Sequence, residues 1–214
     1  MFTFLSSVYL AFLVVAFTAI GRALALPQSA GIVPQMSTPE ELIRAAETGE
    51  LVIVPGPGLP SLESLNLTSR DLVVRALARL ERLKEAEDTE RGSSSLTKRY
   101  TPTCDYNSAL LLQDRVAFCF EYLHSIGSTT CAVPSWGSRF CHTVTGTWDV
   151  SWWGRVNGAS YTQSSCADVA NGGLWVMNNC RFYYPPNNPY YYIQEGTNAA
   201  WGNENLIVEI KGWV

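Results

Sequence analysis

Residues 165–180 read SCADVANGGLWVMNNC, and this stretch decides the fold because it predicts a helix with a cysteine at each end. Ser165, followed three residues later by Asp168, forms a capping pattern that starts a helix. Apolar or small residues recur at spacings of 3, 4, 3 and 4, which places them on one face of the helix: Cys166, Val169, Gly173, Val176 and Cys180. Glycine inside a helix costs about 1 kcal/mol relative to alanine. Gly172 and Gly173 therefore predict that this helix approaches a neighbouring element closely.

A second helix is expected between residues 107 and 126, because apolar residues recur there at spacings of 4, 3, 4 and 3. These residues are Leu112, Val116, Cys119, Leu123 and Ile126. Four runs rich in strand-forming residues predict strands over 130–136, 139–153, 191–199 and 205–211, with a turn at Gly202-Asn203 between the last two. The predicted fold class is α+β, with two helices packed on an antiparallel sheet as a disulfide-stapled α/β sandwich.

All six cysteines lie after residue 100, at Cys104, Cys119, Cys131, Cys141, Cys166 and Cys180. No Cys-x-x-Cys pair occurs, and only two histidines could complete a zinc site. In an oxidising compartment this pattern favours three disulfides over a metal site, and we expect no metal and no cofactor. Six cysteines allow 15 pairings, among which the sequence does not choose.

The first 99 residues predict a secretory precursor. An apolar run over residues 8–20 is too short to span a membrane and fits a signal peptide, with cleavage after Ala25. All six cysteines and all seven tryptophans follow the dibasic pair Lys98-Arg99. We therefore expect a signal peptide over 1–25, a pro-domain over 26–99 that is removed after Lys98-Arg99, and a mature cysteine-rich domain over 100–214. The expected location is extracellular, with no membrane span.

The predicted pro-domain has structure of its own. Thr38, with Pro39 and Glu41, opens a short helix, and Thr68 with Asp71 caps a longer one. An apolar run over 51–54 ends at a Pro-Gly turn. Asn66-Leu67-Thr68 is a glycosylation sequon, which makes Asn66 a candidate modification site. The segment could be a solvated spacer, an intramolecular chaperone or an inhibitor, and the sequence leaves these open.

The order of motifs after residue 100 resembles a group of small secreted six-cysteine fungal proteins. The motifs are Tyr122-Leu123-His124-Ser125-Ile126-Gly127, Ser165-Cys166-Ala167-Asp168-Val169-Ala170, Trp175-Val176-Met177-Asn178-Asn179-Cys180 and Gly202-Asn203-Glu204-Asn205-Leu206-Ile207-Val208. The ending is similar to fungal killer-toxin-like α/β sandwiches, and the overall plan resembles kexin-processed effectors of plant-pathogenic fungi. The resemblance implies an α/β-sandwich fold and a function as a secreted effector or toxin. It supplies no catalytic residue, since its motifs are structural.

Candidate chemistry in the side chains is sparse. His124 is expected near a helix end and His142 on a strand, where each has a structural explanation. Eight carboxylates could include a glycosidase pair, although no motif joins any two: Asp105, Asp114, Glu121, Asp149, Asp168, Glu195, Glu204 and Glu209. We therefore expect a protein that is not an enzyme. With five Lys/Arg against eight Asp/Glu after residue 99, nucleic acid is not an expected partner.

Aromatic residues are abundant beyond what one small core needs, which favours a binding surface. The predicted surface comprises Arg155, Arg181, Tyr184, Tyr191 and Trp152. The expected function is a secreted fungal effector or toxin-like protein that binds a host plant protein, causing necrosis or modulating defence. A killer-toxin-like antimicrobial and a cell-wall polysaccharide binder remain alternatives. A monomer is expected.

Overall fold

The computed structural model describes residues 38–87, 100–145, 149–183 and 191–213, all within the compact unit Val33–Val214. Its largest sheet has six strands, ordered β1 (Val52–Pro55), β5 (Ser138–Val144), β6 (Asp149–Val156), β11 (Asn203–Trp213), β10 (Gly196–Ala200) and β2 (Thr103–Cys104). A three-stranded sheet has the order β3 (Leu110–Leu112), β9 (Tyr191–Gln194) and β8 (Arg181–Tyr183), and a third sheet pairs β4 (Thr130–Pro134) with β7 (Tyr161–Ser165). The registers of these sheets are antiparallel, as predicted.

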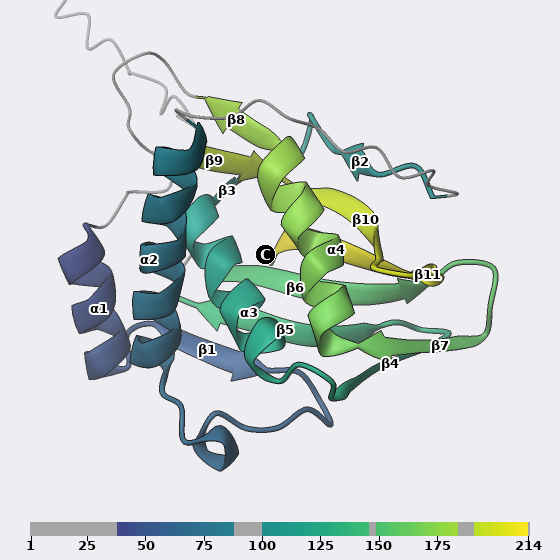
Figure 1. Cartoon of the computed structure of the whole chain (residues 1–214), viewed down its shortest axis with the longest axis horizontal. Helices are drawn as coiled ribbons and strands as arrows, with labels where there is room; N and C mark the ends of the chain where they lie inside the picture. Colours follow the sequence, from purple (N-terminus) through teal and green to yellow (C-terminus); the bar gives the residue numbers. More distant parts are fainter. Residues whose placement is uncertain (1–37, 88–99, 146–148, 184–190, 214) are drawn as a thin grey trace, which may run out of the picture. The chain divides into compact units, whose positions relative to one another are not determined.

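Four α-helices occur in the described part of the chain: α1 (Pro39–Thr48), α2 (Ser69–Glu87), α3 (Gln113–Ser125) and α4 (Cys166–Asn179). A short 3₁₀ turn covers Glu63–Leu65. The α+β class is therefore confirmed, while the expected count of two helices is too low for this unit. The difference arises because α1 and α2, which precede the dibasic pair, belong to the same packed unit as α3 and α4 (Figure 1).

Three predicted elements differ from the structure in their extent. The strand predicted over 191–199 is two strands, β9 and β10, which lie in different sheets. The helix predicted over 107–126 begins at Gln113, because Leu110–Leu112 form a strand in which Leu111 pairs with Ile193. The single strand predicted over 139–153 is two strands, β5 and β6, which pair with each other in antiparallel register. A run of strand-forming residues gives the propensity of each half but does not show where the chain reverses.

Helix α4 lies against the sheet at very short range, as its glycines predicted. Ser165 is the N-cap of this helix, and its Oγ accepts a hydrogen bond from the Asp168 backbone N–H at 3.0 Å. A Cβ atom on Gly173 would lie 2.1 Å from the ring of Trp152, and one on Gly172 would lie 2.6 Å from the Ala199 carbonyl oxygen. Glycine at both positions is what permits this contact.

Three disulfides join all six cysteines, as expected, and leave no free thiol. Cys104 is bonded to Cys180, Cys119 to Cys141, and Cys131 to Cys166. Each bridge ties a helix, or its end, to a strand, so the helical layer is fixed covalently to the sheets. Among the described residues, no helix has both the length and the apolar character needed to cross a membrane.

Residues 38–87, which we call the leading segment, pack on the domain that follows Arg99. Strand β1 extends the six-stranded sheet at its edge, pairing with β5 from Val52↔Val144 to Pro55↔Cys141. Figure 1 shows α2 lying alongside α3, with α1 on its outer side. The predicted caps are present: Thr38 and Glu41 form a reciprocal capping box, and the Asp71 carboxylate accepts hydrogen bonds from the Thr68 backbone N–H and hydroxyl.

Candidate functional site

Three exposed aromatic side chains lie in turns or at a strand end that the topology brings to one end of the sheets. Trp136 is 83% exposed, Trp201 is 61% exposed and Tyr161 is 54% exposed. Trp136 lies in the turn from β4 to β5, Tyr161 begins β7, and Trp201 lies in the turn from β10 to β11. Large aromatic surface in water is unfavourable, so a group of such side chains indicates a binding surface.

Backbone pairing and one side chain hold these three positions near one another. Tyr161 pairs with Pro134, two residues before Trp136. The Asn203 side-chain amide, two residues after Trp201, donates hydrogen bonds to the Thr162 hydroxyl at 3.1 Å and to the Gln163 carbonyl at 2.7 Å. The start of β11 is thereby attached to β7. In Figure 1 this is the right-hand side, where β4, β7 and the start of β11 meet.

Arg155 adds a cation to the same end of the sheet. It pairs with Ile207 near the start of β11, and its side chain is about half exposed, at 51%. The Arg155 Nε lies 3.3 Å from the Glu209 carboxylate, which Lys211 also contacts at 3.1 Å. The Glu209 side chain is 22% exposed and would keep its contact with Lys211 if Arg155 turned to a partner. Because ion pairs near the surface contribute only about 1 kcal/mol, Arg155 can exchange Glu209 for a partner at little cost. We call Trp136, Tyr161, Trp201 and Arg155 the aromatic end.

The face of the sheet next to the aromatic end carries a cation–aromatic contact. Trp152 points toward α4, so alternation along β6 turns Trp153 and Arg155 to the opposite face. There the Lys211 ammonium lies 4.9 Å from the centre of a Trp153 ring. The Trp153 indole N–H donates to the Ser151 hydroxyl at 3.1 Å. The aromatic end is therefore continuous with a polar, partly aromatic sheet face.

The structure separates the five residues predicted to form a binding surface. Arg155 lies at the aromatic end, whereas Trp152 is fully buried against α4 and belongs to the core. The prediction that Trp152 belongs to the binding surface is wrong, because strand alternation turns Trp153 outward instead. Arg181 lies in the separate three-stranded sheet, where its Nε donates to the Met177 carbonyl at 3.1 Å.

The predicted binding surface also includes two tyrosines, Tyr184 and Tyr191. Tyr191 lies in β9 opposite Tyr183, and its side chain is not among those described. Tyr184 lies outside the described residues, as do the processing residues Ala25, Lys98 and Arg99. Asn66 is exposed at the end of the 3₁₀ turn, so its side chain is accessible, and its glycosylation stays a prediction.

Sequence reasoning missed Trp136, Tyr161 and Trp201, although a signal for two of them was present. Trp136 and Trp201 each precede a glycine, and both Gly137 and Gly202 have positive φ, at 87° and 71°. Glycines of this kind occur in tight turns, which lie on the surface. A tryptophan immediately before such a glycine therefore predicts exposed aromatic surface.

The carboxylates considered for catalysis serve the fold where the structure describes their contacts. Glu195 accepts a hydrogen bond from the Gly212 backbone N–H at 2.8 Å, and burial raises the pKa of its carboxyl. The carboxyl of Asp114 also has a raised pKa, because burial outweighs the nearby Arg115. Glu121 pairs with Arg79 of the leading segment. Among the described residues, no three His, Cys, Asp or Glu side chains are grouped to hold a metal ion.

The two histidines lie in different surroundings. His124 is exposed near the end of α3, where its ring stacks on Phe120 at a centroid distance of 5.5 Å. His142 lies on β5 between Val54 of β1 and Ser151 of β6. Burial, and then the charge of Arg139, lower the pKa of His142 below its usual value of 6.5.

The lowered pKa of His142 predicts a loss of stability in mild acid. Below about pH 6.5 the unfolded chain binds a proton that the folded chain resists, so the free energy of unfolding should fall as pH decreases through this range. Replacing His142 with Gln should remove that part of the pH dependence. Urea unfolding of both proteins between pH 7.5 and pH 5 tests this, since subtraction cancels the opposite contribution of Glu195. If the free energy of unfolding depended on pH in the same way in both proteins, His142 would not be the cause of the acid destabilisation.

The part of the chain that carries this site matches a protein family. The family described as "Domain of unknown function (DUF8794)" matches residues 99–212, which is more than half of the chain and includes the whole aromatic end. No curated protein and no solved structure matches the chain. By the extent of the match, the chain belongs to the DUF8794 family.

Proposed function

We propose that this chain is the precursor of a secreted fungal effector or toxin-like protein that acts by binding a host plant protein through the aromatic end. The observation that carries the proposal is the gathering of three exposed aromatic side chains and Arg155 at one end of the sheets. Trp, Tyr and Arg are the residues most often found at the centres of protein interfaces. A rigid, disulfide-bonded scaffold supports such a surface, because little conformational entropy is lost on binding.

The proposed compartment is extracellular. Three disulfides persist in an oxidising environment, and their helix-to-strand arrangement suits a small domain that must survive outside the cell. The signal peptide proposed over residues 1–25 would direct the chain there.

Processing after Lys98-Arg99 is part of the same proposal. The family match begins at Arg99, the second residue of the dibasic pair, which supports a functional unit that starts at Tyr100. We expect the secreted form to contain a chain that begins at Tyr100. Replacing Lys98 and Arg99 with alanine should leave a single longer chain, because a dibasic-specific protease needs these cations. N-terminal sequencing of culture filtrate identifies the first residue of the wild-type chain and of the alanine variant. A wild-type chain that is not cut after Arg99 would contradict the proposed processing.

Substitutions at the aromatic end should reduce activity without unfolding the protein. We expect Trp136→Ala, Trp201→Ala and Arg155→Ala each to weaken leaf necrosis or defence modulation at least tenfold, since truncated interface anchors cost about 2 kcal/mol or more. The measurement is a dilution series of purified protein infiltrated into plant leaves. Exposed positions leave the melting temperature nearly unchanged, which circular dichroism checks.

Tyr106→Ala is the matched control. Tyr106 is 73% exposed but lies just after β2, which pairs with the start of β10, at the opposite end of that strand from the Trp201 turn. It should keep full activity. If Tyr106→Ala lost activity while the variants of the aromatic end did not, the proposed binding surface would be wrong.

A polysaccharide is the second candidate partner, because exposed tryptophans can stack on sugar rings. Chitin and cellulose pull-down with the wild type and Trp136→Ala separates this candidate from a host protein. Growth-inhibition assays on other fungi test the antimicrobial alternative. Binding to polysaccharide that depends on Trp136, without any effect in leaves, would favour the second candidate.

A further inference from the structure

The leading segment completes the sheet and the core of the domain that follows it. Strand β1 forms four residue pairs with β5, and the Gly56 N–H beyond it donates to the Phe140 carbonyl at 2.7 Å. A Cβ atom on Gly56 would lie 1.8 Å from the Arg139 carbonyl oxygen, so the two backbones are in direct contact. Seven buried apolar residues of the segment belong to the common core: Leu42, Leu51, Ile53, Leu72, Val73, Ala76 and Leu80.

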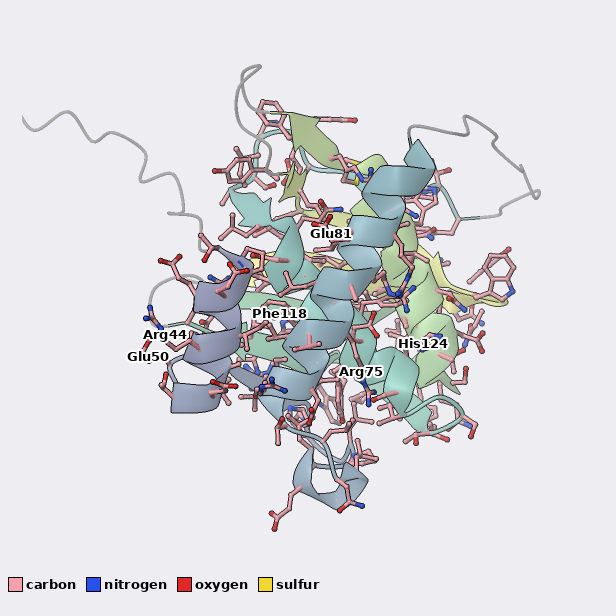
Figure 2. All side chains as sticks on the ribbon, turned by 60° about the vertical axis from the view of Figure 1, so that its left-hand side comes forward. Arg44, Glu50, Arg75, Glu81, Phe118 and His124 are labelled. Atoms are coloured by element: carbon pink, nitrogen blue, oxygen red, sulfur yellow. A yellow bond between two sulfur atoms is a disulfide. The ribbon has the colours of Figure 1, made fainter. Side chains whose placement is uncertain are left out.

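Helix α2 covers a side of α3 that would otherwise face water. A single apolar stripe along one face would not bury as many residues of α3 as the structure does. Ten are buried: Gln113, Arg115, Val116, Ala117, Phe118, Cys119, Phe120, Glu121, Tyr122 and Leu123. A helix buried all round must be covered on every side. Figure 2 shows the fully buried Phe118 between α1 and α2, and Arg44 on the outer side of α1.

Polar contacts make this interface specific. The Arg79 guanidinium pairs with the Glu121 carboxylate, which is nearly buried, and lies over the Phe120 ring at 4.4 Å from its centre. The Tyr122 hydroxyl donates to the Pro60 carbonyl at 2.7 Å. Burial raises the pKa of Tyr122 to about 12, so the hydroxyl keeps the proton that it donates. Loss of the segment would leave Glu121 and Tyr122 without these partners.

No disulfide crosses from the leading segment to the domain, because the six cysteines pair with one another within residues 104–180. Hydrolysis of the Arg99–Tyr100 peptide bond by a protease, with water as the co-reactant, would therefore leave only non-covalent contacts. If the segment then left, the edge of β5 and the apolar side of α3 would be exposed. Such an edge and such a patch promote association with other chains.

We propose that the leading segment stays bound after cleavage, so that the processed protein is a non-covalent complex of two chains. The proposal rests on the processing step of the proposed function, and it names residues 38–87 as the partner that fits the β5 edge and α3. The segment is then a permanent part of the scaffold. The aromatic end lies on strands and turns outside this interface and stays available to a host protein.

Cleavage of the purified precursor in vitro tests this directly. The precursor is produced without its dibasic protease, cut with a dibasic-specific endoprotease and passed through size-exclusion chromatography and native mass spectrometry. We expect both pieces to co-elute in a 1:1 complex that survives high salt and separates only in denaturant. Separate elution of a folded 100–214 domain, whether monomer or dimer, would overturn the proposal.

Two adjacent residues of α2 provide a matched pair of variants. Val73 is fully buried and Val74 is 38% exposed. After cleavage, Val73→Asp should release the segment, whereas Val74→Asp should co-elute like the wild type. Release from both variants, or from neither, would contradict the interface.

A milder pair covers the case in which Val73→Asp prevents folding of the precursor. Arg79→Ala removes the partner of Glu121 and should speed dissociation of the cleaved complex by roughly tenfold or more, while Arg82→Ala, at an exposed position on the same helix, should not. Equal rates for these two variants would count against the interface. None of these readouts uses plant tissue, so a stable complex without leaf activity would refute the proposed function and leave this proposal standing.

Discussion

Replacing both Cys104 and Cys180 with alanine should lower the free energy of unfolding by about 4 kcal/mol. This bridge closes a loop with a sequence separation of 76 residues, the longest of the three. The entropy that a crosslink removes from the unfolded chain grows with loop length, and roughly 4–5 kcal/mol follows for this length. The bridge also holds β2 in place in the native state, because β2 is a two-residue strand with only two pairing positions on β10.

Urea unfolding of the uncut precursor measures this loss, with the Cys119→Ala, Cys141→Ala double variant for comparison. That bridge has a separation of 22 residues, so chain entropy alone predicts a loss about 1 kcal/mol smaller. Because Cys119 and Cys141 are fully buried, a larger loss for this pair would show that packing outweighs chain entropy. A loss below about 1 kcal/mol for Cys104 and Cys180 would contradict the prediction.

Substituting Gly173 with valine should lower the free energy of unfolding by about 3 kcal/mol. A first side-chain carbon at this position would lie 2.1 Å and 2.4 Å from two atoms of the Trp152 ring, which is fully buried. Overpacking of a core typically costs about 1–3 kcal/mol, and a β-branched side chain in a helix adds to the cost. For a chain of this size the melting temperature should fall by about 6–12 °C.

Two comparisons identify the clash as the cause. Asn171→Ala, at an exposed position of the same helix, should leave stability unchanged or raise it, because alanine favours helices. Trp152→Leu, combined with Gly173→Val, should recover part of the loss, since the smaller side chain makes room. The Trp152 indole N–H is buried without a hydrogen-bond partner among the described residues, so no polar contact is lost with the ring. A double variant whose losses simply add would contradict this explanation.

Local signals in the sequence predicted the elements whose causes are local. The capping residues Thr38, Thr68 and Ser165 start helices where they were expected, because a cap acts within one turn of the chain. The boundary of α3 was less accurate, since Leu110–Leu112 leave the helical pattern to pair with β9, about 80 residues later in the chain. A pairing of that kind has no local signature.

The aromatic end was predictable only in part for the same reason. Composition indicated surplus aromatic residues, and Arg155 was selected correctly as exposed. Which of Trp152 and Trp153 faces the core depends on the register of β6 against β11 and on the position of Gly173, neither of which the sequence shows. Trp136, Tyr161 and Trp201 are far apart in the chain, and the β4–β7 pairing with the Asn203 contacts brings them to one end.

By itself, the sequence determined the α+β class, the helix caps, the close-packing glycines and the use of all six cysteines in disulfides, because each depends on residue type and short-range spacing. The tertiary structure alone decided the three cysteine pairings, the burial of Trp152 and the packing of residues 38–87 on α3 and β5. These depend on contacts between residues distant in the chain. The free energy that stabilises these contacts comes from apolar surface that two elements bury together, and the amount of that surface is set only when the elements pack against each other.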